Sequence, residues 1–134
     1  METFLHHMQI NVRASNMGFY RELMAFLGWH TLMDGDGFLG VGCADRASLW
    51  FIGETKDVAN DYDGPGTNHV AIGAPSQADV DAACAYLAKN KIPALFETPR
   101  HRPEFSGGPD NTYYQVMFES PDKILFEVVY TGPK

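Results

Sequence analysis

The sequence predicts an α+β fold built from two βαβββ modules, and a repeated motif is the first reason. Residues 6–12 and residues 68–74 are both short strand-like runs with a histidine, and a helical pattern follows each. His7 and His69 lie 62 positions apart, close to half of the 134-residue chain, which is typical of a duplicated module. Each half has one helical pattern and several hairpin signals, which favours open, curved, mainly antiparallel sheets over a doubly wound parallel sheet.

The first module opens with a strand at residues 4–13, where polar and apolar side chains alternate. Its mostly apolar face, with Ile10 and Val12, is expected to pack on the core, while His7 lies on the opposite face. A helix follows, which Ser15 or Asn16 can cap and Gly28 ends. Three more strands are predicted at residues 29–33, 38–43 and 47–52.

The second module repeats this order with a strand at residues 68–74. Ser76 followed by Asp79 resembles a capping box at the start of a helix, which Asn90 closes. A long polar loop at residues 98–111 is either a solvated surface loop or a lid or binding loop. The strands are predicted at residues 92–97, 112–119 and 124–130.

Length and composition indicate one domain over residues 1–134, with module one at about 1–56, a linker at about 57–66 and module two at about 67–134. Hydrophobic residues make up 45% of the chain, enough for a core. The net charge of −7 argues against binding nucleic acids or anionic membranes. No transmembrane run or signal peptide is expected, and the two cysteines fit reduced thiols, so a cytoplasmic location is expected.

Three side chains on the open faces of the strands suit a metal. His7 and His69 occupy matched positions in the two modules, and Glu127 is flanked by apolar residues on the last strand, where an unpaired charge is costly. Two neutral imidazoles and one carboxylate form the facial triad that binds a divalent transition metal and leaves positions open for substrate. His6 lies on the other face of its strand by alternation and is interpreted as structural.

Three stretches of the chain resemble the vicinal oxygen chelate superfamily, which includes glyoxalase I, fosfomycin-resistance proteins, bleomycin-binding proteins and extradiol dioxygenases. They are residues 7–12, the helix with Phe19-Tyr20 and its end at Leu27-Gly28-Trp29, and Ser120-Pro121-Asp122-Lys123 with the strand to Glu127. The resemblance implies paired βαβββ modules in a cupped sheet around one divalent metal ion (Fe, Mn, Zn or Ni). It implies His7, His69 and Glu127 as ligands, and a homodimer.

The departures from the family pattern narrow the expected chemistry. Glyoxalase I has a fourth ligand, a glutamate, where this chain is expected to place Trp50, which argues against glyoxalase I chemistry. The fosfomycin type surrounds its substrate with basic residues, of which only Arg100 and Arg102 are present near the opening.

The residues around the metal either form an aromatic and apolar pocket for a small-molecule substrate or simply fill the space that the sheets enclose. The expected substrate-binding residues are Trp50, Tyr113, Gln115, Met117, Asn11 and Arg100. Tyr113 and His101 are candidates for proton transfer by residue type alone. Gln9 and Asn11 either orient a ligand or hydrogen-bond each other.

The sequence therefore favours a metal-dependent enzyme that acts on an oxygen-chelating, aromatic or hydrophobic substrate, with dioxygenase-like chemistry ahead of lyase chemistry. The alternative is a non-catalytic protein of the bleomycin-resistance type that sequesters a small molecule.

Overall fold

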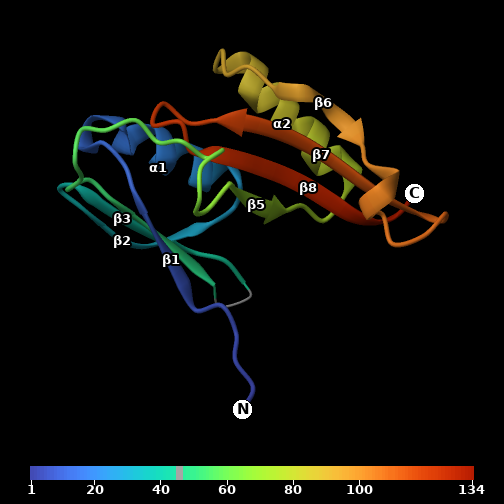
Figure 1. Cartoon of the computed structure of the whole chain (residues 1–134), viewed down its shortest axis with the longest axis horizontal. Coiled ribbons are helices and arrows are strands. Elements are labelled where there is room, and N and C mark those ends of the chain that lie inside the picture. Colours follow the sequence, from blue (N-terminus) through green and yellow to red (C-terminus); the bar gives the residue numbers. More distant parts are fainter. Residues whose placement is uncertain (45–46) are drawn as a thin grey trace. The chain divides into compact units, whose positions relative to one another are not determined.

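The computed structural model describes residues 1–44 and 47–134 and divides the chain into two compact units, residues 1–59 and 60–134 (Figure 1). Each unit is a βαβββ module with one open, mixed, four-stranded sheet. The predicted α+β class and the predicted repeat are therefore confirmed. The division between the units falls inside the predicted linker.

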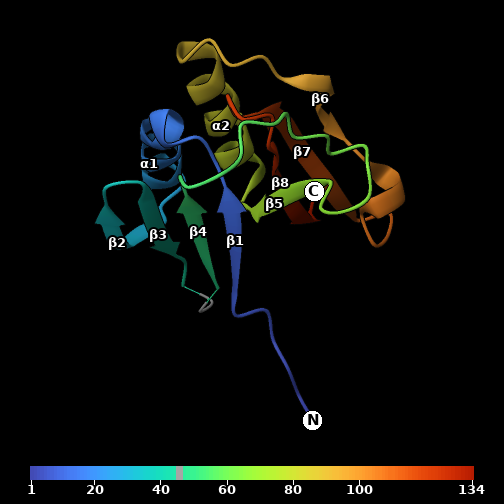
Figure 2. The ribbon, with the colours of Figure 1, turned by 60° about the vertical axis from the view of Figure 1, so that its left-hand side comes forward.

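In unit 1 a parallel pair and two hairpins form the sheet, in the order β1-β4-β3-β2 with β1 parallel to β4. Figure 2 shows these strands side by side with α1 packed behind them. Tyr20 of the helix stacks on Phe51 of the sheet, with ring centroids 4.6 Å apart, and both side chains are fully buried. The elements are β1 (His7–Asn11), a 3₁₀ turn (Ala14–Asn16), α1 (Met17–Phe26), β2 (His30–Gly35), β3 (Phe38–Gly42) and β4 (Ser48–Ile52).

Unit 2 repeats this topology in the order β5-β8-β7-β6, with β5 parallel to β8. Its helix α2 covers one face of the sheet (Figure 1), and Val80, Ala83 and Leu87 are its buried residues. The opposite face of this sheet is the one that carries Glu127. The elements are β5 (His69–Gly73), α2 (Gln77–Lys89), β6 (Leu95–His101), a 3₁₀ turn (Pro103–Phe105), β7 (Asn111–Glu119) and β8 (Leu125–Pro133).

The helix ends follow the sequence signals at three of four places. Gly28 has a φ of +80°, and the N–H of Trp29 donates to the carbonyl of Met24 at 2.9 Å, which is a Schellman ending. Ser76 Oγ accepts from the N–H of Asp79 at 3.2 Å, as the capping box predicts, and Asn90 is the C-cap. The predicted side-chain cap of α1 is wrong, because the N-cap Asn16 makes no side-chain capping hydrogen bond and a 3₁₀ turn leads into the helix instead.

The predicted strand at residues 92–97 and loop at 98–111 need correction. Strand β6 begins at Leu95 and continues to His101, because Arg100 and His101 pair with β7, after a shift of register that follows Leu95. Phe96 and Glu97 have positive φ values at this irregularity, which alternation of polarity does not reveal. The connection to β7 is therefore shorter than predicted and contains a 3₁₀ turn.

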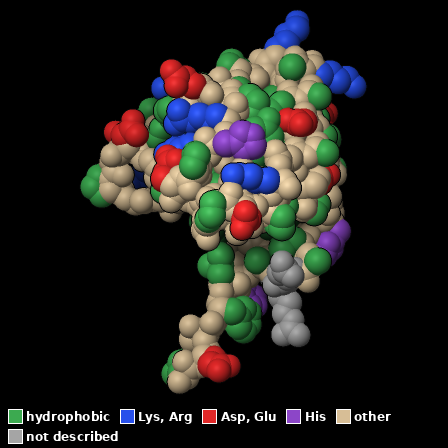
Figure 3. All heavy atoms as spheres, turned by 90° about the vertical axis from the view of Figure 1, so that its right-hand side faces the viewer, with side chains coloured by type: hydrophobic (Ala, Val, Ile, Leu, Met, Phe, Trp, Pro, Cys, Tyr) green, Lys and Arg blue, Asp and Glu red, His purple; other side chains and the backbone are tan. Residues whose placement is uncertain are grey.

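One face of the molecule carries side chains of both signs of charge. On the face drawn in Figure 3, basic, acidic and hydrophobic side chains alternate without a large patch of one sign. No helix in the described part of the chain combines the length and the hydropathy that a membrane span needs. Cys43 and Cys84 are both free thiols.

Candidate metal and ligand-binding face

The pairing of β5 with β8 brings His69 and Glu127 together. The register places His69 beside Leu125 and Ala71 beside Glu127, so both polar side chains lie on the same face, two residues apart along the strands. Because Ala71 is small, the Glu127 side chain has room to lie over β5. His69 Nε2 lies 3.2 Å from Glu127 Oε2, and the two side chains are 38% and 2% exposed.

The hydrogen bonds of Asn68 identify the tautomer of His69. The Asn68 amide nitrogen donates to the carbonyl of Tyr62 at 2.8 Å, so its oxygen must face His69 Nδ1, which lies 2.7 Å away. Nδ1 therefore carries the proton in a neutral imidazole, and Nε2 presents a lone pair toward the carboxylate. Two electron-rich atoms 3.2 Å apart are stable only with a proton on Nε2 or a cation between them.

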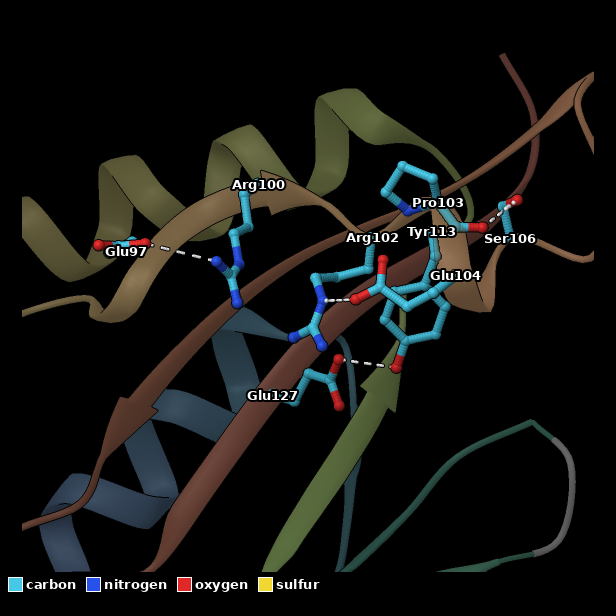
Figure 4. A network of polar contacts seen from close by, with 8 residues as sticks. All are labelled: Glu97, Arg100, Arg102, Pro103, Glu104, Ser106, Tyr113 and Glu127. Atoms are coloured by element: carbon cyan, nitrogen blue, oxygen red, sulfur yellow. Dashed lines mark hydrogen bonds and ion pairs between the residues drawn. The ribbon is translucent and has the colours of Figure 1, made fainter.

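Tyr113 is the second partner of Glu127. Its hydroxyl donates to Glu127 Oε1 at 2.8 Å (Figure 4). Burial and this bond to the carboxylate raise the pKa of Tyr113 to about 12, so the phenol stays protonated and remains a donor at neutral pH. One carboxylate oxygen is thus held by the phenol, while the other faces the imidazole. The hydrogen bond from Tyr113 is the kind of outer-sphere support that a ligating carboxylate usually has.

The matching place in unit 1 has no carboxylate. There the register pairs His7 with Ser48 and Gln9 with Trp50, so Trp50 stands where Glu127 stands in unit 2. The indole N–H of Trp50 donates to Ser48 Oγ at 3.0 Å, which holds the ring over the sheet. Unit 1 therefore offers a histidine and an aromatic surface, and unit 2 offers a histidine and a carboxylate.

A cavity of about 610 Å³ opens on this face of unit 1. His30 lies in it against Gly42, whose missing side chain leaves room for the ring. The interpretation of His6 as facing the other way is wrong. Strand β1 begins only at His7, so alternation does not apply to His6, and its Nδ1 lies 2.8 Å from His7 Nδ1. The cavity is lined by His6, His7, Gln9, His30, Leu32, Gly42, Cys43, Ala47, Ser48, Trp50 and Ile52.

The two amides of β1 bond to each other. Gln9 Nε2 donates to Asn11 Oδ1 at 3.0 Å, which is one of the two roles that the sequence left open. Both side chains are exposed, and Asn11 is not among the residues that line the cavity.

On the sheet of unit 2, Tyr113, Gln115 and Met117 share the face of Glu127. Met117 pairs with Glu127 in the register, and Tyr113 reaches the carboxylate directly. Tyr114 lies between Tyr113 and Gln115 on β7 and therefore points to the other face, where its hydroxyl donates to Asp81 Oδ1 of α2 at 2.8 Å. The side chains that the sequence placed around the metal in this module are therefore on one face.

Two arginines approach the same face from β6 and the turn after it. Arg100 pairs with Gln115, and Figure 4 shows Arg100 and Arg102 reaching from this segment toward the side of the sheet with Glu127. Arg102 Nε lies 2.6 Å from Glu104 Oε1, and its guanidinium carbon lies 4.8 Å from the centre of the Phe105 ring. Phe105 in turn meets the edge of Tyr113, with centroids 5.6 Å apart. Sequence reasoning missed Phe105, because only the 3₁₀ turn directs it to this face.

His101 lies on the opposite face from Glu127. It pairs with Tyr114, its ring lies 4.6 Å from that of Tyr114, and its Nδ1 lies 2.6 Å from Thr112 Oγ1. It lines a second cavity of about 580 Å³, together with Gln77, residues of the 103–109 loop and Lys134. The sheet therefore separates the His101 side chain from Glu127.

Neither unit by itself gathers a complete metal site from the described residues. Within residues 1–44 and 47–134 there is no cluster of three or more histidine, cysteine, aspartate or glutamate side chains that could hold an ion. Unit 2 supplies two ligand atoms of the right chemistry, His69 Nε2 and Glu127 Oε2, which face each other. These two residues fit a divalent metal ion, and a third ligand is still required.

Known proteins of this fold are found only by comparison of structures. No family model matches the sequence, and no curated protein matches it. A candidate glyoxalase from Bacillus halodurans is 28% identical over 94% of both chains, with a TM-score of 0.76. A glyoxalase/bleomycin resistance protein from Albidiferax ferrireducens T118 is 16% identical over 94% of this chain and 98% of that chain, with a TM-score of 0.72.

A glyoxalase/dioxygenase from Nostoc punctiforme is 20% identical over 96% of this chain and 91% of that chain, with a TM-score of 0.67. The structural neighbours are thus glyoxalase, bleomycin resistance and dioxygenase proteins, and they match the vicinal oxygen chelate superfamily that the sequence motifs resemble. The fold is the glyoxalase-like fold.

Proposed function

We propose that this chain is a metal-dependent enzyme of the vicinal oxygen chelate type. The observation that carries the proposal is the facing pair of His69 Nε2 and Glu127 Oε2 at 3.2 Å, with the imidazole proton held on the far nitrogen. The polar contacts that the described residues make to Glu127 come from His69 and Tyr113, and neither is a permanent cation. A buried carboxylate in such surroundings is stabilised by a divalent cation.

His7 is proposed as the third ligand, supplied either by the same chain or by a second copy in a homodimer. The support is its position on β1, which matches the position of His69 on β5 in the repeated topology. Sedimentation velocity gives the assembly state, and a monomer with an intact metal site would exclude the two-chain form.

The proposed substrate is small, chelates through oxygen, and is aromatic or hydrophobic. When bound, the metal ion would act as a Lewis acid on the chelating oxygens. Tyr113 would hold the carboxylate in place through its hydroxyl, and the ring edges of Tyr113 and Phe105 would offer an apolar surface. Because Trp50 occupies the place of a second carboxylate, the site has no matching acid–base residue there, which favours dioxygenase-like over glyoxalase I chemistry.

Metal binding by stripped protein tests the proposal. In calorimetry the wild-type protein should take up about one Zn²⁺, Mn²⁺, Ni²⁺ or, under anaerobic conditions, Fe²⁺ ion per chain. Oxygen uptake with catechols then tests the reaction. His69→Ala and Glu127→Gln should each weaken binding more than about tenfold, because each removes a ligand. His101→Ala is the matched control, since that histidine lies on the other face of the same sheet and should leave binding unchanged. Wild-type protein that binds none of these ions would refute the proposal.

A second candidate function is sequestration of a small aromatic molecule without catalysis. The observation that favours it is the cavity of about 610 Å³ in unit 1, where Trp50, Leu32 and Ile52 lie and where none of the described lining residues is a carboxylate. Quenching of Trp50 fluorescence by aromatic ligands in metal-free protein would support this candidate. Dependence of that quenching on added metal would favour the enzyme.

A further inference from the structure

Two buried nitrogen donors on the Glu127 face of unit 2 have no hydrogen-bond partner among the residues that the structure describes. They are Gln115 Nε2 on β7 and Arg100 Nε on β6. Gln115 is only 3% exposed, so water does not readily take the place of a protein partner. Buried donors are nearly always paired in folded proteins, and an exception calls for an explanation such as a missing ligand.

The two donors lie next to each other. Arg100 and Gln115 are direct partners in the antiparallel β6–β7 register, so their side chains leave the sheet on the same face. Figure 4 shows Arg100 directed toward the side of the sheet with Glu127. Both unpaired atoms are N–H donors, and a single acceptor with two oxygens can satisfy both.

The charge of Arg100 is also weakly compensated. Its ion pair is with Glu97, whose side chain is 90% exposed, at a long distance of 3.5 Å. Arg102, two residues on, is instead held by Glu104 at 2.6 Å. Of these two arginines, Arg100 is therefore the one that can take an anionic partner at low cost.

The pair lies one step along the sheet from the proposed metal. Gln115 pairs with Val129 of β8, and the neighbouring position of β7, Met117, pairs with Glu127. The diagonal from Gln115 to Glu127 therefore spans about 7–8 Å. A ligand whose oxygens chelate a metal held by His69 and Glu127 would need a second polar group about 7–8 Å away to reach Gln115 and Arg100.

We propose that Arg100 and Gln115 form a carboxylate-binding subsite, and that the substrate is an acid whose carboxylate lies at the opposite end from its metal-chelating oxygens. The proposal rests on the proposed function for the chelating end only. One cation and one amide donor match a monoanionic, planar carboxylate. A phosphate dianion would be expected to recruit Arg102 as well, and Glu104 already holds that residue.

Two probes that differ by one carboxylate test the subsite. Zn²⁺-loaded protein is titrated with 3,4-dihydroxybenzoate and with catechol, because both offer two adjacent chelating hydroxyls. We expect the acid to bind about tenfold tighter than catechol. Arg100→Met and Gln115→Met should each remove most of this preference, because the affinity for the acid falls far more than the affinity for catechol. Gln115→Glu should reverse the preference by placing a like charge against the carboxylate.

Lys89→Met is the matched control, because it removes one positive charge from the end of α2 and should leave the preference intact. Circular dichroism shows whether each variant is folded. Equal affinity of the wild type for both probes, or a preference that survives both variants, would overturn the subsite even if the metal binds. Conversely, a preference for 4-hydroxybenzoate over phenol that depends on Arg100, in protein that binds none of Zn²⁺, Mn²⁺, Ni²⁺ and Fe²⁺, would support the subsite and refute the metal enzyme.

Discussion

Replacing Tyr113 with phenylalanine removes the hydroxyl that donates to Glu127 Oε1 at 2.8 Å and leaves the rest of the ring in place. The acceptor is a carboxylate that is 2% exposed, so water replaces the lost bond poorly. A hydrogen bond to a charged group contributes about 1.5–3 kcal/mol. Because the Tyr113 side chain is only part-buried, we expect the free energy of unfolding to fall by the lower part of that range, about 1.5 kcal/mol.

The pH dependence of this loss provides a second signature. The pKa of Tyr113 is raised from its ordinary value of 10.0 to about 12 in the folded chain. The folded state therefore favours the neutral phenol, and its contribution to stability is complete below pH 10 and is lost as the pH rises through about 12. The pKa values of Tyr62 and Tyr114 are also raised to about 12, but these residues are present in both proteins and their effects cancel in the difference.

Urea unfolding followed by circular dichroism, at several pH values from 7 to 12, measures this difference. Tyr130→Phe is the control, because that hydroxyl donates to the carbonyl of Pro133 at the exposed end of β8 and should contribute about 0.5 kcal/mol or less. If Tyr113→Phe were as stable as the control at pH 7, Glu127 would not depend on the phenol, and the argument for a fixed carboxylate would fail.

Two further predictions concern packing and capping. Gly40→Ala would place a Cβ 2.5 Å from Trp50 Cζ3, so we expect this substitution to lower the free energy of unfolding by about 1–3 kcal/mol and to shift the indole fluorescence. Gly18→Ala meets nothing within 4 Å, so it should leave the stability and the fluorescence nearly unchanged or stabilise α1. Normal fluorescence in Gly40→Ala would contradict this packing. Ser76→Ala removes the hydroxyl that accepts from Asp79 N–H and should lower the free energy of unfolding by about 1 kcal/mol. Ser15→Ala is the control and should have little effect. A loss in Ser76→Ala as small as that in Ser15→Ala would show that the cap of α2 contributes nothing.

The extent of β6 and the position of His101 could not be read from the sequence. Pairing with β7 extends β6 to His101, and the irregularity after Leu95 determines which of its residues share a face with Gln115. A bulge shifts alternation by one residue and leaves no reliable mark in composition. The sequence therefore indicates Arg100 as a substrate residue but not its pairing with Gln115, and it does not indicate that His101 lies on the other face of the sheet from Glu127.

The sequence by itself determined the βαβββ repeat, most of the helix ends and the faces of β1 and β5. These features depend on neighbours a few residues away, since side chains alternate along a strand and repeat every 3.6 residues along a helix. Only the tertiary structure decided that Glu127 lies 3.2 Å from His69 and that Tyr113 holds its other oxygen. Those contacts join residues far apart in the chain, and they depend on strand register, which the packing of the whole sheet determines.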